Sequence, residues 1–182
     1  MDVEKLVKKV KKGNKSALYK LITLEKDAYF RLAFTYMGNE QDALAALAKM
    51  TTTVYEQMNQ LENVEAFYRW SKVILVNQCK QLLENRQKLV YMDEYIAVNE
   101  GKYSYPKHHL YYKNEKQYEI SDMLKILNAE QKEAIQLKYF HDLDDETIAE
   151  ILDVPNEKVQ SIIDYGLKKL NERYRSEDDE TY

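Results

Sequence analysis

Five polar side chains in the first half of the chain have the types and spacing needed to hold nucleic acid. They are Arg69, Lys72, Asn77, Lys80 and Arg86. On a helix, Arg69, Lys72 and Lys80 fall within an arc of about 80°. Arg86 follows at the helix end. Cations on one face neutralise phosphates without selecting a sequence, while the amide and nearby aromatic rings can hold unstacked bases. The pattern predicts a nucleic-acid surface, with a solvated polar face as the alternative.

A second polar face lies on the last helix, after the break at residues 153–155. Its outward residues are Glu157, Lys158, Gln160, Ser161, Asp164 and Tyr165, with one cation against two anions. Lys158 and Gln160 have the chemistry for bidentate contacts to guanine and adenine, each worth about 1–3 kcal/mol of discrimination. The acids repel phosphate. Base reading in the major groove and binding to a protein therefore both stay open for this face.

The elements that position the first face are predicted to be helices. Apolar residues recur every 3.6 residues from Asn14 to Gly38 as one continuous stripe, and the pattern resumes after Asn39 and runs toward Leu61. Asn63 is predicted to cap a long helix that ends at about Arg86. Phe67 and Trp70 are assigned to its buried side. We therefore expect three or four stacked helices.

The second half also predicts helices, in an arrangement typical of a helix-turn-helix. A short helix is expected from Ile120 to Leu127, and another from Ala134 to Phe140. Asp144 or Asp145 is expected to cap the third, and Asn156 the last. The inward side of the last helix is assigned to Val159, Ile162, Ile163, Gly166, Leu167 and Leu170.

Composition supports an all-α fold of two domains. Only 4 glycines and 2 prolines occur in 182 residues, too few for the turns of a sheet protein. We place the domains at 1–90 and 119–175, with a linker at 91–118 that carries seven tyrosines, and an acidic tail at 176–182. Because of its tyrosines, the linker is expected to dock, either on its own domains or on a partner. The first 95 residues carry a net charge of +3, against −5 for residues 119–175.

Several functional classes are excluded or disfavoured by the sequence. Cys79 is the only cysteine, so an internal disulfide and a cysteine zinc cluster are ruled out. No nucleophile with a matching base is recognisable, and we expect neither an enzyme nor a cofactor or metal. His108 and His109 are assigned to the linker. No apolar run is long enough to cross a membrane, and an intracellular protein is expected.

The order of these segments resembles the extracytoplasmic-function (ECF) sigma factors, a small two-domain class of bacterial transcription initiation subunits. Residues 29–43 and 67–70 are similar to the second conserved sigma region. The stretch from Leu127 to Pro155, with 131–135, 137–140 and 147–152 as its matching parts, resembles the fourth region. Both resemblances stand in the family's order along the chain.

The resemblance implies a noncatalytic, cytoplasmic protein that directs core RNA polymerase to promoters and stabilises the melted −10 element. It assigns −10 DNA to the five residues of the first face, and the −35 element to Lys158, Gln160 and Ser161. Asp42, Leu44 and Leu47 would contact the polymerase, although family acids beyond residue 43 are missing. The implied partners are core polymerase, promoter DNA and an anti-sigma factor. The alternative is a sigma-derived interaction regulator that has lost sequence-specific DNA reading.

Overall fold

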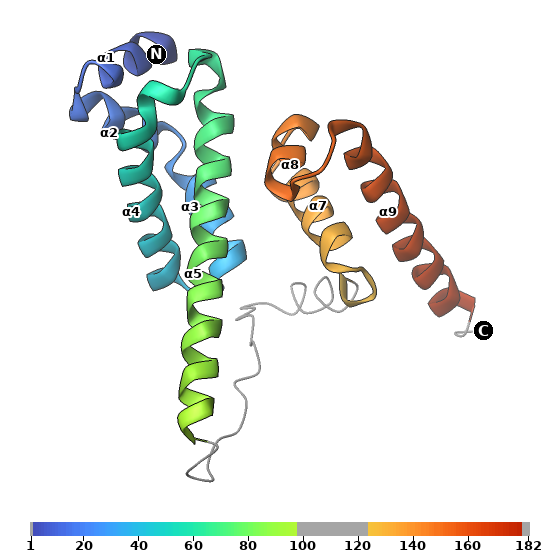
Figure 1. Ribbon diagram of the computed structural model, residues 1–182. Helices are drawn as coiled ribbons and strands as arrows, with labels where there is room; N and C mark the ends of the chain where they lie inside the picture. Colours follow the sequence, from blue (N-terminus) through green and yellow to red (C-terminus); the bar gives the residue numbers. More distant parts are fainter. Residues whose placement is uncertain (1, 98–123, 180–182) are drawn as a thin grey trace. The chain divides into compact units, whose positions relative to one another are not determined.

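The computed structural model describes residues 2–97 and 124–179, and every regular element within these two ranges is a helix. The chain divides into two compact units, one on each side of the interval between the ranges (Figure 1). The all-α prediction is therefore confirmed. The predicted linker lies outside the described residues from residue 98 onward, and the acidic tail does so from residue 180, so the domain boundaries remain predictions.

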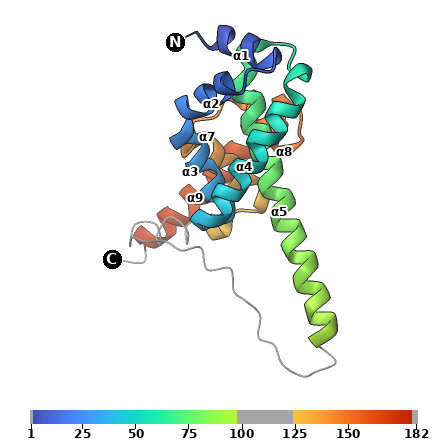
Figure 2. The ribbon, with the colours of Figure 1, turned by 90° about the vertical axis from the view of Figure 1, so that its left-hand side faces the viewer.

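The first unit is a bundle of helices with a two-helix hairpin at one end. Helices α3, α4 and α5 pack on one another, and α1 packs on α2 (Figure 2). The elements are α1 (Val3–Lys11), α2 (Lys15–Leu24), α3 (Lys26–Met37), α4 (Glu40–Gln57), the 3₁₀ turns η1 (Met58–Gln60) and η2 (Val64–Ala66), and α5 (Phe67–Ala97). The bundle thus sets α5 against two other helices.

A side-chain cap begins α4 as predicted, whereas Asn63, predicted to cap the long helix, caps the turn η2 that leads into α5. The Asn39 carboxamide oxygen accepts a hydrogen bond from the Asp42 N–H at 2.9 Å, and the Asn63 oxygen accepts one from Glu65 N–H at 3.0 Å. Each bond satisfies an N–H that the first helical turn leaves without a partner. Gly38 ends α3 with φ 73°, a left-handed conformation that favours glycine.

The continuous helix predicted between Asn14 and Gly38 is wrong, because the chain breaks at Glu25 into α2 and α3. No glycine or proline occurs between residues 15 and 37, so no helix breaker marks this position, although the buried side turns by roughly 90° from α2 to α3 at 100° per residue. Their burial partners differ: α2 packs on α1, whereas α3 packs on α4 and α5. A single straight helix could not make both sets of packing contacts.

Helix α5 is also longer than predicted. It continues past Arg86 to Ala97, into the first residues assigned to the linker. No glycine or proline interrupts residues 86–97, so nothing in the local sequence opposes another three turns of helix. The expected end at about Arg86 is therefore wrong.

The second unit contains the predicted helix-turn-helix. Its elements are η3 (Leu124–Ile126), α7 (Ala129–Tyr139), α8 (Asp145–Leu152) and α9 (Asn156–Asp179). Asp144 is the cap of α8, since its carboxylate accepts from the Thr147 N–H at 2.8 Å. Asp153, with φ 55°, closes α8 and turns the chain toward α9. The break of three residues between α8 and α9 is confirmed.

Three details of the second unit differ from expectation. The helix predicted from Ile120 appears among the described residues only as the turn η3. Asn156 is the first residue of α9 and not its cap, a shift of one residue at a boundary preceded by Pro155. Leu167 is exposed and not inward, because it lies at the edge of the apolar stripe.

Gly166 explains how closely α9 approaches α7. A Cβ at this position would lie 2.7 Å from the Ile135 Cδ1 atom, so only the absence of a side chain permits the observed packing without a shift of its neighbour. Gly166 and Ile163 are both buried on the inward side, as predicted.

Candidate nucleic-acid interface

The predicted cationic face lies on the N-terminal half of α5. Arg69, Lys72 and Lys80 are all partly exposed, and Asn77 is exposed. The helix therefore carries this set at its surface, as the periodicity indicates. The structure adds to it the acidic side chains that come from other helices.

Lys72 is held by an acid from a distant part of the chain. Its Nζ atom lies 3.5 Å from the Glu25 Oε2 atom, and its side chain is only 18% exposed. Glu25 sits at the break between α2 and α3. Lys72 therefore offers less free charge to a phosphate than its position on the helical wheel suggests.

Arg86 is also paired, and its partner comes from the residues assigned to polymerase binding. The Arg86 Nη2 atom donates to the Asp42 Oδ1 atom at 2.6 Å. Asp42 lies in the first turn of α4, where its charge also favours the N-terminal end of the helix dipole. The structure thus joins two residues that sequence reasoning had assigned to separate surfaces.

The other two residues assigned to polymerase contact lie further along α4. Leu44 is 51% exposed, which is unusual for a leucine on a packed helix, and Leu47 is partly buried. Ala43 and Ala46, each directly preceding one of these leucines in the sequence, are fully buried in the bundle. Leu44 is therefore an apolar side chain at the surface of α4, whereas Leu47 lies at the boundary of its packed side.

Phe67 and Trp70, both assigned to the buried side of α5, have different environments. Phe67 has no exposed surface, and its ring packs edge-on against that of Tyr68 with centroids 5.2 Å apart. Trp70 is only partly buried, so the expectation that it belongs to the core is wrong. A partly exposed indole one residue from Arg69 is available for stacking.

A buried polar contact fixes α5 in the bundle beneath this face. The hydroxyls of Tyr29 on α3 and Ser71 on α5 share a hydrogen bond at 2.6 Å, and Ser71 also donates to the Phe67 carbonyl oxygen at 2.8 Å. Burial raises the pKa of Tyr29, so the phenol stays protonated at any physiological pH. The contact is a neutral link that sets the rotation of α5 against α3.

The polar face of α9 is formed as predicted. Lys158, Gln160 and Ser161 are exposed, and so are the other three residues assigned to the outward side. The Gln160 Nε2 atom donates to the Asp164 Oδ1 atom at 2.9 Å, one helical turn away. The Ser161 hydroxyl donates to the Lys158 carbonyl oxygen at 2.8 Å. The side-chain amide of Gln160 therefore already donates a hydrogen bond to a residue of the same helix.

Comparison with known proteins finds a family match in the second unit and similar proteins along most of the chain. Residues 123–172, which include α7, α8 and most of α9, match the family described as Sigma-70, region 4. The chain is 28% identical over 172 residues to RNA polymerase sigma factor SigV of Bacillus subtilis (strain 168), covering 93% of this chain and 98% of SigV. It is 24% identical over 183 residues to ECF RNA polymerase sigma factor SigW of the same organism, covering 96% and 98%. These matches support an ECF sigma factor family for the chain.

The fold of this chain also matches solved structures. One is the co-crystal structure of the sigma factor RpoE in complex with the anti-sigma factor NepR from Bartonella quintana. The TM-score is 0.62 with 18% identity, and the match covers 86% of this chain and 96% of the matched chain. This likeness establishes a shared fold for the helical units.

Sequence reasoning missed the acidic residues that pair with the polar residues of the predicted DNA-binding faces. Glu25 and Lys72 are far apart in the chain, so no local signal connects them, and the same holds for Asp42 and Arg86. The contact between Gln160 and Asp164 was detectable, because their spacing of four residues places them side by side on a helix.

The residues considered for other chemistry have ordinary environments where the structure describes them. Burial raises the pKa of the Cys79 thiol to about 12, which makes it unreactive. Within residues 2–97 and 124–179, no group of three or more His, Cys, Asp or Glu is arranged to hold a metal ion. No helix in the same ranges is long and apolar enough to cross a bilayer. His108 and His109 lie outside the described residues.

Proposed function

We propose that this protein is the promoter-recognition subunit of RNA polymerase, an ECF sigma factor that recruits the core enzyme and stabilises the melted −10 strand. The observation that carries the proposal is the near-complete match to two sigma factors, which spans both helical units in the same order. It favours this function over a sigma-derived regulator that has lost DNA reading. Such a subunit is noncatalytic and works in the cytoplasm, where polymerase and promoters are.

The −10 function is assigned to α5. Arg69, Lys80 and Lys72 supply charge toward phosphates, and the exposed amide of Asn77 together with the partly exposed Trp70 ring supplies contacts for unstacked bases. The pairing of Arg86 with Asp42 gives Arg86 a structural role instead, as a link between α5 and the start of α4.

The polymerase function is assigned to α4, and the −35 function to α9. Leu44 provides exposed apolar area, with Leu47 beside it and Asp42 at the helix start. On α9, Lys158, Gln160 and Ser161 face outward, as a recognition helix requires. An anti-sigma partner is part of the proposal, because a sigma factor of this fold is known in complex with one.

Reconstituted transcription tests the proposal. The full chain is mixed with core RNA polymerase and a pool of promoter fragments, and specific transcripts are expected. Replacing Arg69, Lys72 and Lys80 together by glutamine should reduce open-complex formation and lower its salt dependence by roughly 0.7 per lost single-strand contact in a log–log plot. The control is Lys168→Gln, which removes an exposed charge from the later part of α9. Core binding without any transcript would contradict the proposed function.

A further inference from the structure

The positive charge of the first unit is concentrated in two segments, residues 1–26 and residues 67–88 of α5. Residues 1–26 hold eight lysines and three acids, whereas residues 27–95 hold seven basic residues and nine acids. Within the second range, residues 67–88 hold five of the basic residues and one acid, so the N-terminal segment and this part of α5 both carry an excess of positive charge. The N-terminal segment has no role in the functions assigned above.

Three lysines of α1 and the C-cap residue Lys12 form a single stripe. Lys5, Lys8, Lys9 and Lys12 are all exposed, and at 100° per residue they fall within an arc of about 100°. The opposite side of the helix carries Leu6, Val7 and Val10, which are buried. Packing of the apolar side therefore fixes the direction in which this lysine stripe faces.

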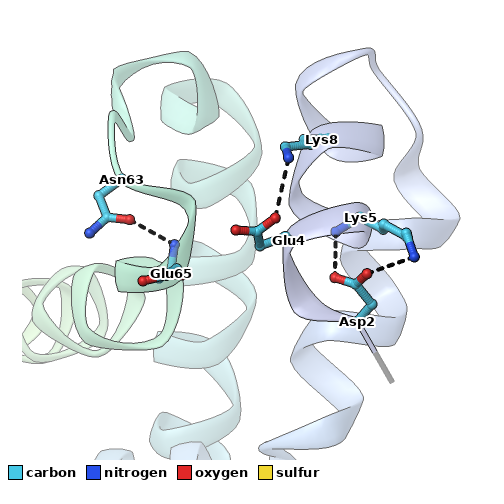
Figure 3. A network of polar contacts seen from close by, with 6 residues as sticks. All are labelled: Asp2, Glu4, Lys5, Lys8, Asn63 and Glu65. Atoms are coloured by element: carbon cyan, nitrogen blue, oxygen red, sulfur yellow. Dashed lines mark hydrogen bonds and ion pairs between the residues drawn. The ribbon is translucent and has the colours of Figure 1, made fainter.

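The stripe is only partly neutralised by acids of its own helix. Lys5 pairs with Asp2 at 2.8 Å, and Lys8 pairs with Glu4 at 3.2 Å (Figure 3). Lys9 and Lys12 have no acid three or four residues away on either side. The helix also places like charges at these spacings, which opposes helix formation. A bound polyanion would relieve that repulsion.

The position of α1 connects the stripe with the beginning of α5. Helix α1 packs on η2, and the Lys11 ammonium donates to the Leu61 carbonyl oxygen in the segment that leads into it. The turn η2 passes directly into α5 at Phe67. The stripe thus belongs to the same end of the bundle as Arg69 and Trp70.

The chemistry of the stripe favours phosphates over a protein partner. Protein interfaces have an apolar or aromatic centre, but no large apolar side chain is exposed among the described residues 2–16. Lysines at intervals of one helical turn, with an apolar side turned away, are suited to sequence-independent neutralisation of a nucleic-acid backbone.

We propose that the lysine stripe of α1 is a second DNA-contact surface, which binds backbone phosphates of promoter DNA next to the segment held by α5. The inference rests on the proposed function. Lys9 and Lys12 are its principal contacts, since Lys5 and Lys8 already have acidic partners. It would add affinity to the open complex without adding sequence preference.

The test uses holoenzyme reconstituted from the full chain and core polymerase, with a linear fragment selected in the transcription assay. Open-complex affinity is measured across a salt series for the parent, Lys9→Gln, Lys12→Gln and the double variant. Each lost contact should reduce the log–log slope by about 0.9 and weaken binding roughly five- to tenfold at 0.1 M salt. Lys20→Gln is the matched control, because Lys20 is an exposed lysine on α2 outside the stripe.

The outcomes separate this inference from the function on which it rests. A normal parent with unchanged slopes in the double variant would overturn the inference alone. Weaker binding to core polymerase without DNA, with an unchanged DNA slope, would also overturn it and assign the stripe to the polymerase. A parent that forms no open complex with any fragment would overturn the proposed function, and this inference with it. Thermal unfolding of each variant verifies that α1 remains folded.

Discussion

The two polar faces assigned to DNA are constructed differently. On α5, Lys72 and Arg86 are paired with Glu25 and Asp42, which come from other helices. On the outward face of α9, Gln160 bonds to Asp164 and Ser161 bonds to the Lys158 carbonyl oxygen, so both contacts stay within the helix. The charge available on α5 therefore depends on the fold of the first unit, whereas the face of α9 is a property of its own sequence.

This difference predicts which surface fails when a core is damaged, and the largest effect is expected at Phe67. The side chain is fully buried at the first residue of α5, so Phe67→Ala should destabilise the first unit by about 3–5 kcal/mol. Phe67→Leu, which retains more of the volume, should cost less. The fluorescence of Trp70, the only tryptophan, reports unfolding of this unit in urea.

The second unit serves as the internal control for that experiment. Its core contains Ile135, Leu137 and Ile163 and makes a separate compact unit. Amide hydrogen exchange in α9 should therefore be the same in Phe67→Ala and in the parent. Equal loss of protection in α9 would show that the two units do not unfold independently. The proposed difference between the two polar faces would then be wrong.

A second prediction concerns base reading by α9. If Gln160 contacts a base edge, Gln160→Ala should remove about 1–3 kcal/mol of discrimination at one base pair of the −35 element. The measurement is transcription by reconstituted holoenzyme from a promoter library randomised at −35. Asp164→Ala is the companion variant, because it removes the acceptor that engages the Gln160 amide. An unchanged base profile in Gln160→Ala would leave α9 without a reading role at this residue.

The difference between contacts within one helix and contacts between helices also explains which features could be predicted from the sequence. All six outward residues of α9 were predictable, because periodicity on one helix determines which side is buried when a single apolar stripe exists. The break at Glu25 was not predicted, because no glycine or proline marks it. Nor were the partners of Lys72 and Arg86, because a contact between distant helices leaves no periodic signal. Trp70 was assigned to the core by residue type, but large aromatic side chains are often only partly buried.

The smallest expected effect decides whether Arg86 belongs to the fold or to the DNA surface. A double-mutant cycle with Asp42→Asn and Arg86→Gln should give a coupling free energy of about 0.2–1 kcal/mol in urea unfolding, the range for exposed ion pairs. The Arg86 side chain is 56% exposed, so a larger value is not expected. If Arg86 only links α5 to α4 through Asp42 and does not contact DNA, Arg86→Gln should also leave the salt dependence of open-complex formation unchanged. Zero coupling together with a reduced salt slope would instead return Arg86 to the phosphate-binding set, and α5 would then use its whole cationic arc as its sequence alone predicts.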